Sequence, residues 1–277
     1  MEKIHIMING LPGNVAKTMA DAALKDERFE LIPYSLTGPE IPQSRFRVDS
    51  FEFSLVKPEE REKVFLRLVE EYPGFIAVDY THPSAVNANA QFYTRNRIPF
   101  VMGTTGGDRE ALEESVVKGQ TPAVIAPNMA KQIVGFQAMM EYAANTFPDL
   151  FAGYSLRVKE SHQQSKADTS GTAKAMVGYF NTLGANFKKE EIEQIRDPEI
   201  QEKEWQIPKE YLSGHGWHTY TLKSADDTVL FEFKHNINGR DIYVSGTFDA
   251  VVFLKEKLTQ PDSGQRLYTM IDVLKKT

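Results

Sequence analysis

Residues 160–173, ESHQQSKADTSGTA, bring together residue types that can do chemistry. His162 can give or take a proton near neutral pH, and Lys166 adds a point charge four residues later. Residues 170–172 precede an apolar run with helical spacing, so free N–H groups and hydroxyls at a helix start could hold an anion. The segment therefore predicts a site for an anionic substrate that takes up a proton.

Each of these residues also has an ordinary structural role open to it. Thr169 or Ser170 could be a plain helix N-cap. Lys166 could pair with Asp168 on the surface, a contact worth under about 1 kcal/mol. A lone histidine is more often structural or exposed than catalytic. The hypothesis rests on the conjunction of these residues in one short segment.

A second candidate site opens the chain. The strand-like residues 3–9 lead into a glycine-containing turn and then into residues 14–24, which favour a helix. N–H groups at such a helix start can hold a pyrophosphate. Gly10 would make the tight turn, Gly13 would let the backbone approach the phosphates, and Ala16 would let the helix pack on the strand. The spacing G-x-x-G-x-x-A also occurs in an ordinary strand–helix turn, but its setting favours a dinucleotide site.

The end of the second strand candidate, residues 29–36, bears on which nicotinamide nucleotide is bound. The chain continues into Thr37 and Gly38, meets no acid until Glu40, and has its nearest arginines at Arg45 and Arg47. A carboxylate there would hold the ribose 2′-OH of NAD, whereas small hydroxyls suit a 2′-phosphate because like charges repel. The sequence predicts NADPH as the carrier, with NADH as the alternative.

Two more polar loops follow later strand candidates, at residues 79–83 (DYTHP) and 103–107 (GTTGG). Ligands bind beyond the carboxyl ends of parallel strands, so both loops are expected beside the nicotinamide. A flexible turn is the alternative for the second loop, and His82 is interpreted as a turn histidine before a proline. The expected carrier-binding residues are Gly10, Leu11, Pro12, Gly13, Asn14, Val15, Ser35, Thr37, Asp79, Thr81, Gly103, Thr104, Thr105, Pro127, Asn128 and Lys131.

Strands that alternate with helices indicate βαβ units and a parallel sheet over residues 1–130, a Rossmann-type α/β domain that binds the dinucleotide. Its other expected elements are strands at 75–80, 99–105 and 121–128 and helices at 58–71, 84–96 and 108–115.

Residues 131–247 are expected to form an α+β domain for substrate binding and oligomerisation. Its expected elements are helices at 131–147 and 172–184, strands at 154–161, 217–222, 228–235 and 242–248, and a charged, poorly periodic stretch at 187–212. The C-terminal helices, at 248–258 and 268–276, are expected to pack back on the first domain.

Composition excludes several classes of protein. The chain has 277 residues, a formal charge of −6 and no basic stripe, so no nucleic-acid partner is expected. Its lack of cysteine excludes thiolate chemistry and disulfides, and no metal site is predicted. No apolar run approaches the roughly 20 residues that span a bilayer. No secretory signal is recognised, so a cytoplasmic location is expected, or the plastid stroma if a transit peptide was removed.

Four motifs together give the chain a specific resemblance. Residues 10–16, 79–83, 103–106 and 160–173 resemble, in this order, the glycine turn, the DFT-x-P-like loop, the GTTG loop and the E-x-H-x-x-x-K-x-D-x-SGTA segment of the dihydrodipicolinate reductases. The run from His235 through Arg240 to Gly246 is similar to another family motif. The resemblance covers nearly the whole chain.

The resemblance implies NAD(P)H-dependent reduction of a cyclic dicarboxylate with a C=N bond, on the diaminopimelate route to lysine. It implies that His162 is the general acid and that Lys166 binds or protonates beside it. Because the two expected sites lie on separate domains, closure across a hinge is also expected. The implied substrate-binding residues are Gln163, Ser170, Gly171, Thr172 and Arg240.

The chain departs from the usual pattern of this family. Gln163 stands where most bacterial members have a second histidine, and one residue fewer separates Lys166 from Ser170. These features and residues 126–132 resemble the plant-type branch, for which a homodimer is as expected as a homotetramer. A paralogue that reduces another cyclic imine acid is one alternative. A non-catalytic nucleotide-binding regulator is another, which His162 and Lys166 oppose.

Overall fold

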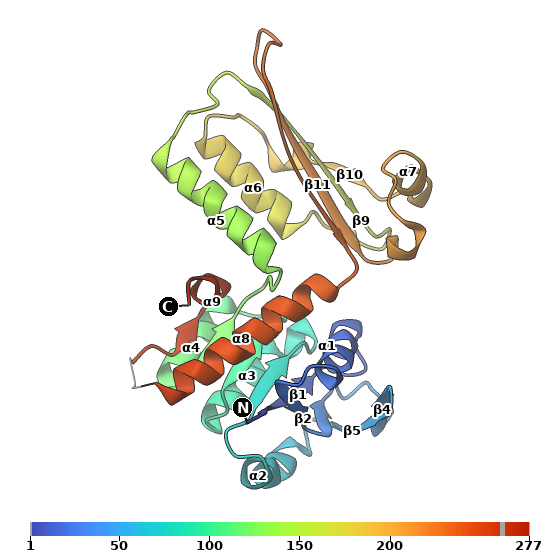
Figure 1. The fold of residues 1–277 in the computed structure, drawn as a ribbon, viewed down its shortest axis with the longest axis vertical. Helices are drawn as coiled ribbons and strands as arrows, with labels where there is room; N and C mark the ends of the chain where they lie inside the picture. Colours follow the sequence, from blue (N-terminus) through green and yellow to red (C-terminus); the bar gives the residue numbers. More distant parts are fainter. Residues whose placement is uncertain (1, 261–263, 277) are drawn as a thin grey trace. The chain divides into compact units, whose positions relative to one another are not determined.

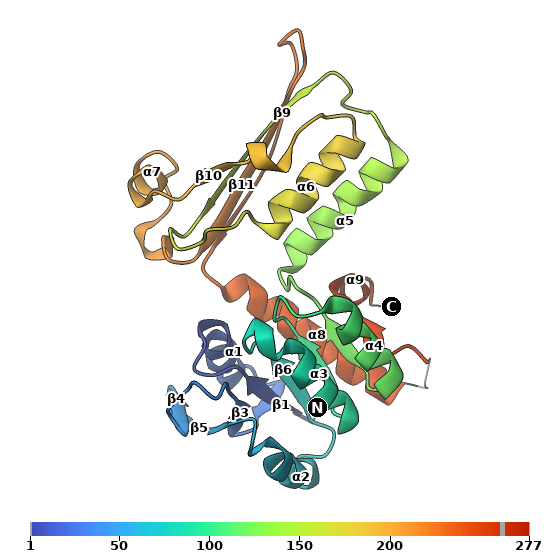
Figure 2. The same cartoon turned by 180° about the vertical axis from the view of Figure 1, so that it is seen from behind.

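The computed structural model describes residues 2–260 and 264–276, which form two compact units. Unit 1 comprises the chain up to Lys131 together with the part from Asp241 onward, and unit 2 comprises Gln132–Arg240 (Figures 1 and 2). The last part of the chain thus belongs to the same unit as its beginning.

Unit 1 is built on a parallel sheet of order β13-β8-β7-β6-β1-β2, which confirms the predicted Rossmann-type fold. Its central strands are buried on both faces and therefore read as continuous apolar runs. The strands are β1 (Ile4–Asn9), β2 (Phe29–Leu31), β6 (Ile76–Asp79), β7 (Phe100–Met102), β8 (Ala123–Ile125) and β13 (Leu267–Tyr268). The helices are α1 (Asn14–Leu24), α2 (Arg61–Glu71), α3 (Val86–Arg95), α4 (Arg109–Gly119), α8 (Asp241–Thr259) and α9 (Met270–Lys275), with a 3₁₀ turn at Pro83–Ala85.

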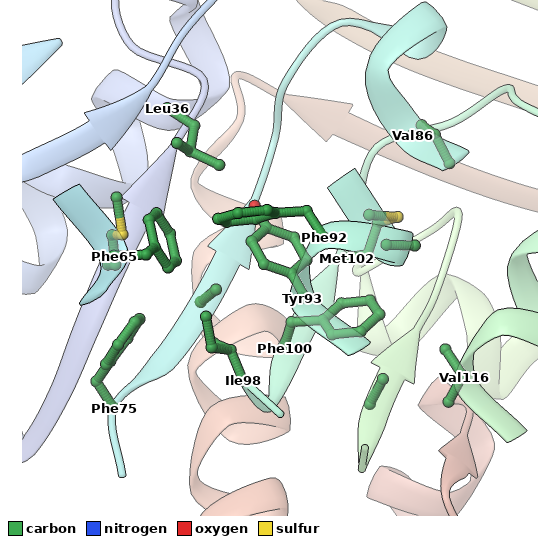
Figure 3. Close-up of a cluster of buried hydrophobic side chains, with 14 of the residues drawn as sticks. Leu36, Phe65, Phe75, Val86, Phe92, Tyr93, Ile98, Phe100, Met102 and Val116 are labelled. Carbon is green, nitrogen blue, oxygen red and sulfur yellow. The ribbon is translucent and has the colours of Figure 1, made fainter. Parts of the chain in front are cut away.

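Aromatic side chains fill the core between the sheet and its helices (Figure 3). Phe92 and Tyr93 of α3 are fully buried, with Phe65 of α2 at 4.6 Å from Phe92 and Phe100 of β7 at 5.1 Å from Tyr93, measured between ring centroids. Burying such a ring stabilises the fold by about 1.5–3 kcal/mol. This packing fixes α3 against the sheet.

A small three-stranded sheet in unit 1 was missed in the sequence. It has the order β3-β5-β4, with β3 at Tyr34–Leu36, β4 at Arg45–Val48 and β5 at Phe51–Val56. Alternating apolar residues, such as Phe53 and Leu55, were the available signal. The expected strand at 29–36 is divided between β2 and β3.

Unit 2 has one four-stranded mixed sheet with two long helices on one face (Figures 1 and 2). The strand order is β10 (Glu193–Ile195), β9 (Ser155–His162), β11 (His215–Lys223) and β12 (Leu230–Asn238). Helices α5 (Lys131–Thr146) and α6 (Gly171–Thr182) supply the apolar layer, and the short α7 (Pro198–Lys203) follows β10. The predicted α+β architecture is confirmed.

The strand predicted at 242–248 is wrong, because these residues form the first turns of α8. Aromatic and β-branched residues suggested a strand, but the helix buries one face through Thr247, Ala250, Val251 and Leu254. Gly246 allows the close approach, since a Cβ there would collide with the Met129 carbonyl oxygen. The tertiary contact therefore overrides the local preference.

Candidate active site

The glycine turn after β1 has the conformation that a phosphate site needs. Gly10 has φ +110°, and a Cβ there would collide with the Tyr80 backbone. Gly13 precedes α1 as its N-cap, and no side chain caps the helix. The first N–H groups of α1 are therefore available to an anion.

Two of the expected carrier-binding residues hold this turn from behind. Ser35 is fully buried and its Oγ accepts a hydrogen bond from the Leu11 N–H at 3.2 Å. The Thr37 Oγ1 donates to the Leu11 carbonyl at 2.9 Å. Both hydroxyls thus fix the turn, and Thr37 also reaches the pocket wall.

A pocket of about 720 Å³ opens in front of the turn. Its walls come from residues 10–13, from residues 36–41 after β3, and from residues 80–85 after β6. Pockets of roughly 300–1,000 Å³ suit molecules of nucleotide size. The side-chain-free cradle at Gly10 and the uncapped helix start fit a dinucleotide.

Two charged side chains line this pocket. The Glu40 carboxylate folds back over Gly38, so that a Cβ on Gly38 would collide with both of its oxygens. Arg61 also lines the pocket, and its guanidinium carbon lies 4.6 Å from the centroid of the Phe92 ring. In contrast, Arg45 pairs with Glu52 at 3.0 Å. Glu40 is the first acid after the strand in sequence, and the structure brings its carboxylate back to the pocket wall.

Asp79, at the end of β6, is the centre of a buried hydrogen-bond network. Its Oδ1 accepts from the Thr81 N–H, the Thr81 hydroxyl and the Thr104 hydroxyl at 2.7–3.0 Å, and its Oδ2 accepts from Asn89 and Tyr93 at 3.0 and 2.8 Å. Asp79 is fully buried. Its carboxylate therefore ties the two predicted ligand loops together.

The remaining expected carrier-binding residues lie in more varied places. Asn14, Thr105 and Pro127 are exposed, and Val15 and Gly103 are half-buried. Asn128 caps the Ala130 N–H, and Lys131 pairs with Asp249 of α8. His82 caps the 3₁₀ turn through the Ser84 N–H, as expected of a turn histidine. Contact between these residues and the carrier stays a prediction.

The end of β9 and the start of α6 meet at Glu160 in unit 2. Glu160 is fully buried; its Oε2 accepts from the Ser170 N–H at 3.0 Å, and its Oε1 pairs with Arg196. Burial acts to raise the pKa of Glu160, but the nearby His218 and Arg196 and the Ser170 N–H outweigh it and lower the pKa to about 2. Glu160 is therefore an anion held by fixed partners.

Ser170 is the N-cap of α6, one of the two residues predicted for that role. Its Oγ accepts from the Thr172 N–H at 3.2 Å. The N–H groups of Gly171 and Ala173 have no hydrogen-bond partner among the residues that the structure describes. They remain available to an anionic ligand, as the sequence predicted for this helix start.

His162 lies beside this helix start with one ring nitrogen fixed and one unpartnered. Its Nδ1 donates to the His215 carbonyl at 3.0 Å, which leaves Nε2 as the acceptor of the neutral ring. Nε2 is buried, lacks a partner within the described part of the chain, and lies 4.0 Å from Glu160 Oε2. Burial, aided by His218, lowers the pKa of His162 to about 4, although Glu160 acts to raise it.

Two further histidines continue this cluster across the sheet. Glu160, His218 and His235 lie opposite one another on β9, β11 and β12. The His218 ring centroid is 5.1 Å from that of His162 and 4.6 Å from that of His235. All four ring nitrogens of His218 and His235 are buried and lack partners in residues 2–260 and 264–276. His218 was not among the residues expected at the site, although alternation along β11 places it on the helix-facing side with Tyr220.

The loop between β9 and α6 is held by residues from 187–212, the charged stretch in which the sequence predicted no helix or strand. Arg196, just after β10, donates to the Lys166 carbonyl at 2.8 Å as well as to Glu160. Gln201 of α7 donates to the His162 carbonyl at 2.7 Å. Lys166 itself pairs with the exposed Asp168 at 2.6 Å, the surface pair considered as its structural alternative. These contacts position the loop that carries Lys166.

The other expected substrate-binding residues are less closely tied to this cluster. Gln163 is half-buried, and its carbonyl accepts from the Lys166 N–H at 3.0 Å. The Arg240 guanidinium packs against Gly214, 3.1–3.5 Å from where a Cβ would lie. Their contact with a substrate stays a prediction.

Glu160, His162 and His218 each place one potential ligand atom within 4.8 Å of the others, a spacing that could suit a metal ion. Arg196 already neutralises the Glu160 carboxylate, however, so a metal ion would face a guanidinium. We interpret the group as a proton-binding cluster, and the absence of a metal stays a prediction.

Acid is expected to destabilise unit 2. Burial lowers the pKa of His162 to about 4 and that of His235 to about 3, whereas both protonate near 6.5 in the unfolded chain. The neutral rings therefore contribute their full stability to the folded protein above pH 6.5. This contribution is lost as the pH falls through the pKa values of the folded protein. We expect each of the two rings to lower the free energy of unfolding by roughly 3 kcal/mol between pH 7 and pH 4.

Urea denaturation at several pH values measures this effect. His235→Phe should make the drop smaller, and Asn236→Ala, an exposed neighbour on β12, should leave it unchanged. An equal drop in His235→Phe and the unaltered protein would contradict the assignment to His235.

The fold and the two sites together define a class of protein. Unit 1 offers a pocket of nucleotide size at the carboxyl ends of a parallel sheet, and unit 2 offers an imidazole beside a helix start with N–H groups that the described residues leave unpartnered. The protein is an NAD(P)H-dependent oxidoreductase.

Comparison with known proteins identifies the family. The family models for the N-terminus and C-terminus of dihydrodipicolinate reductase match residues 4–129 and 133–274. The chain belongs to the dihydrodipicolinate reductase family.

Individual relatives agree with this assignment. A 4-hydroxy-tetrahydrodipicolinate reductase 1, chloroplastic, of Arabidopsis thaliana is 47% identical over 273 residues, 99% of this chain and 78% of that protein. A probable 4-hydroxy-tetrahydrodipicolinate reductase 1, chloroplastic, of Oryza sativa subsp. japonica is 45% identical over 98% of this chain and 78% of that protein. The dipicolinate-bound dihydrodipicolinate reductase of Paenisporosarcina sp. TG-14 shares the fold, with a TM-score of 0.66 and 18% identity over 97% of this chain and 98% of that chain.

Proposed function

We propose that this protein reduces 4-hydroxy-tetrahydrodipicolinate, or the dihydrodipicolinate formed from it, to tetrahydrodipicolinate on the diaminopimelate route to lysine. The observation that carries the proposal is the unpartnered Nε2 of His162 beside the start of α6, where the N–H groups of Gly171 and Ala173 have no partner among the described residues. The reductase relatives, 45–47% identical over nearly the whole chain, support the choice of substrate.

The residues of unit 2 have separable roles in this reaction. The N–H groups of Gly171 and Ala173 bind one substrate carboxylate, and Lys166 leaves its weak surface pair with Asp168 to bind beside it. A bound dihydronicotinamide supplies the hydride. His162, once protonated, donates its Nε2 proton to the ring atom on which the added electrons collect. Glu160 and Arg196 hold the helix start and the loop in place.

The direct test follows NADPH absorbance with substrate generated by an upstream enzyme. The expected result is substrate-dependent loss of absorbance. A protein that binds NADPH but oxidises none of it with this substrate would overturn the proposal. Turnover of another cyclic imine carboxylate at a higher kcat/KM would replace the substrate with that of a paralogous reductase.

We propose NADPH as the preferred carrier, with NADH also accepted. Thr37 and Gly38 offer no carboxylate to the pocket, and Arg61 supplies a positive charge at its wall. Glu40 opposes the 2′-phosphate because its carboxylate lies over Gly38.

Removing the charge of Glu40 is therefore expected to favour NADPH further. Glu40→Gln should tighten NADPH binding about three- to tenfold and change NADH binding little, because only NADPH places a phosphate near this carboxylate. Fluorescence titration measures both constants, with Glu70→Gln, an exposed acid outside the pocket wall, as the matched control. Equal tightening of both carriers would contradict the explanation.

We propose that the protein is a homo-oligomer joined through unit 2. Strand β12 lies at the edge of its sheet, and Leu230 and Phe231 on it are 60% and 42% exposed. A long edge strand with exposed apolar residues is a ready surface for a second copy. Light scattering should give two or four times 31.4 kDa, and Phe231→Lys should lower that mass. A monomer at micromolar concentration would refute this proposal.

The plant relatives are chloroplastic by name, and we propose the plastid stroma as the compartment in a plastid-bearing cell. In the described part of the chain, no helix has both the length and the apolar character to cross a membrane. Imaging of the tagged protein tests this location, and a signal confined to another compartment would contradict it.

A further inference from the structure

We infer that a dicarboxylate binds to this site together with one proton, which is taken up by a buried unit made of His162 and His218 with Glu160 between them. This inference rests on the proposed function, because it places a substrate carboxylate at the start of α6. It adds the source of the proton that the reaction consumes and gives His218 a share in holding it.

The first observation is geometric. His162 Nε2 and His218 Nε2 lie 4.0 and 3.7 Å from the same carboxylate oxygen, Oε2 of Glu160. These distances are too long for hydrogen bonds, so both nitrogens are unpartnered within the described residues. An unsatisfied buried polar atom is costly, because it has lost its hydrogen bonds to water. A proton on either ring would create an ion pair with Glu160 and would remove part of this cost.

The second observation is the balance of charge around the cluster. Three groups lie around the His162 ring, namely Glu160 from β9, His218 from β11 and Arg196 after β10, and His235 from β12 lies on the far side of His218. Arg196 is already committed to Glu160. The cluster without ligand is therefore neutral as a whole when the three rings are neutral.

A bound dicarboxylate changes this balance. It brings two negative charges to a partly buried site, and Lys166 can answer only one of them after leaving Asp168. The second carboxylate is stabilised only if another positive group lies nearby, because an uncompensated buried charge is costly. The imidazoles of His162 and His218 are the groups that can become positive. The lowered proton affinity of His162 in the free protein makes the uptake a consequence of binding.

The proton balance of the reaction then closes within the site. One proton enters with the dicarboxylate and is shared by the pair of rings. Hydride addition gives the substrate an electron pair, and the proton passes from His162 Nε2 to the atom that bears it. Both rings are neutral again when the product leaves.

Calorimetry with pyridine-2,6-dicarboxylate as the probe tests the inference. Binding heats in metal-free phosphate and Tris buffers at pH 7 give the number of protons taken up. We expect about one proton per site, and an affinity that falls about tenfold per pH unit above pH 7. His5→Gln, in β1 of unit 1, should take up the same number. The double variant His162→Gln/His218→Asn should take up almost none.

Uptake of less than about half a proton by the unaltered protein, or of more than half by the double variant, overturns the inference. If the double variant binds no probe, NMR of ¹⁵N-labelled histidine in the unaltered protein decides. The His162 and His218 nitrogens must then change from neutral to protonated shifts on addition of the probe, and unchanged shifts refute the inference. A protein that reduces its substrate but fails these tests retains the proposed function. A protein that neither binds the probe nor oxidises NADPH contradicts both the inference and the proposed function.

Discussion

Replacing His162 with glutamine is expected to lower kcat by about 10²- to 10³-fold, within the range that a positioned general acid contributes. Glutamine keeps a polar group of similar length but has no proton to give at neutral pH. NADPH affinity should stay within about twofold, because the glycine turn, the pocket and its charged residues belong to unit 1. The measurement is steady-state kinetics with fluorescence titration of NADPH on the same preparations.

Two comparisons make this result specific. His5→Gln changes a histidine in β1 and should keep kcat within about twofold of the unaltered protein. A solvent isotope effect on kcat should be present in the unaltered enzyme and should change in His162→Gln, since the donor of the proton changes. If His162→Gln retains more than about a third of kcat, His162 is not the acid, and Lys166 becomes the first candidate.

Local patterns were enough for the features that depend on neighbours in sequence. The turn at Gly10–Gly13 and the helix start at Ser170 follow from residue types whose backbone preferences are strong. The strand that ends at His162 was predicted within one residue. In each case the residues that give the signal lie within a few positions of the feature that they predict.

Features that depend on residues far apart in sequence could not be predicted from local patterns. His218 and His235 join Glu160 only because β11 pairs with both β9 and β12 in one register, and a shift of one residue would turn them to the other face. Helix α8 at 242–248 forms because its face packs in unit 1, against its own strand-like composition. Ser35 and Asp79 were expected at the ligand, and the structure shows their polar atoms engaged within the protein.

Arg196 is the clearest case of a site residue without a local signal, and its loss should have a large effect. It lies in the charged stretch 187–212, where periodicity indicated nothing. Its guanidinium nevertheless pairs with the fully buried Glu160 and holds the carbonyl of Lys166, and its side chain is only 16% exposed. A single side chain thus joins the cluster to the loop before α6.

Arg196→Leu is expected to destabilise unit 2 by about 3–5 kcal/mol, because it leaves the Glu160 carboxylate buried without its countercharge. Urea denaturation measures this change. Arg196→Lys should recover part of the stability but less of kcat/KM, since an ammonium replaces the charge without the forked donors that reach both Glu160 and Lys166. The matched control is Arg157→Leu, which breaks an exposed pair with Glu193 and should cost under about 1 kcal/mol.

The pH dependence separates a buried charge from a simple loss of packing. Arg196 helps to lower the pKa of Glu160 to about 2, so the carboxylate stabilises the folded protein above the unfolded value near 4.5 and this contribution is lost as the pH falls toward 2. Without Arg196 the carboxyl is easier to protonate, and the cost of the variant should shrink from pH 8 to pH 5. Adding Glu160→Gln to Arg196→Leu should restore part of the stability at pH 8, because the unpaired charge is then gone. A cost that is the same at both pH values, with no recovery in the double variant, would show that Arg196 acts through packing alone.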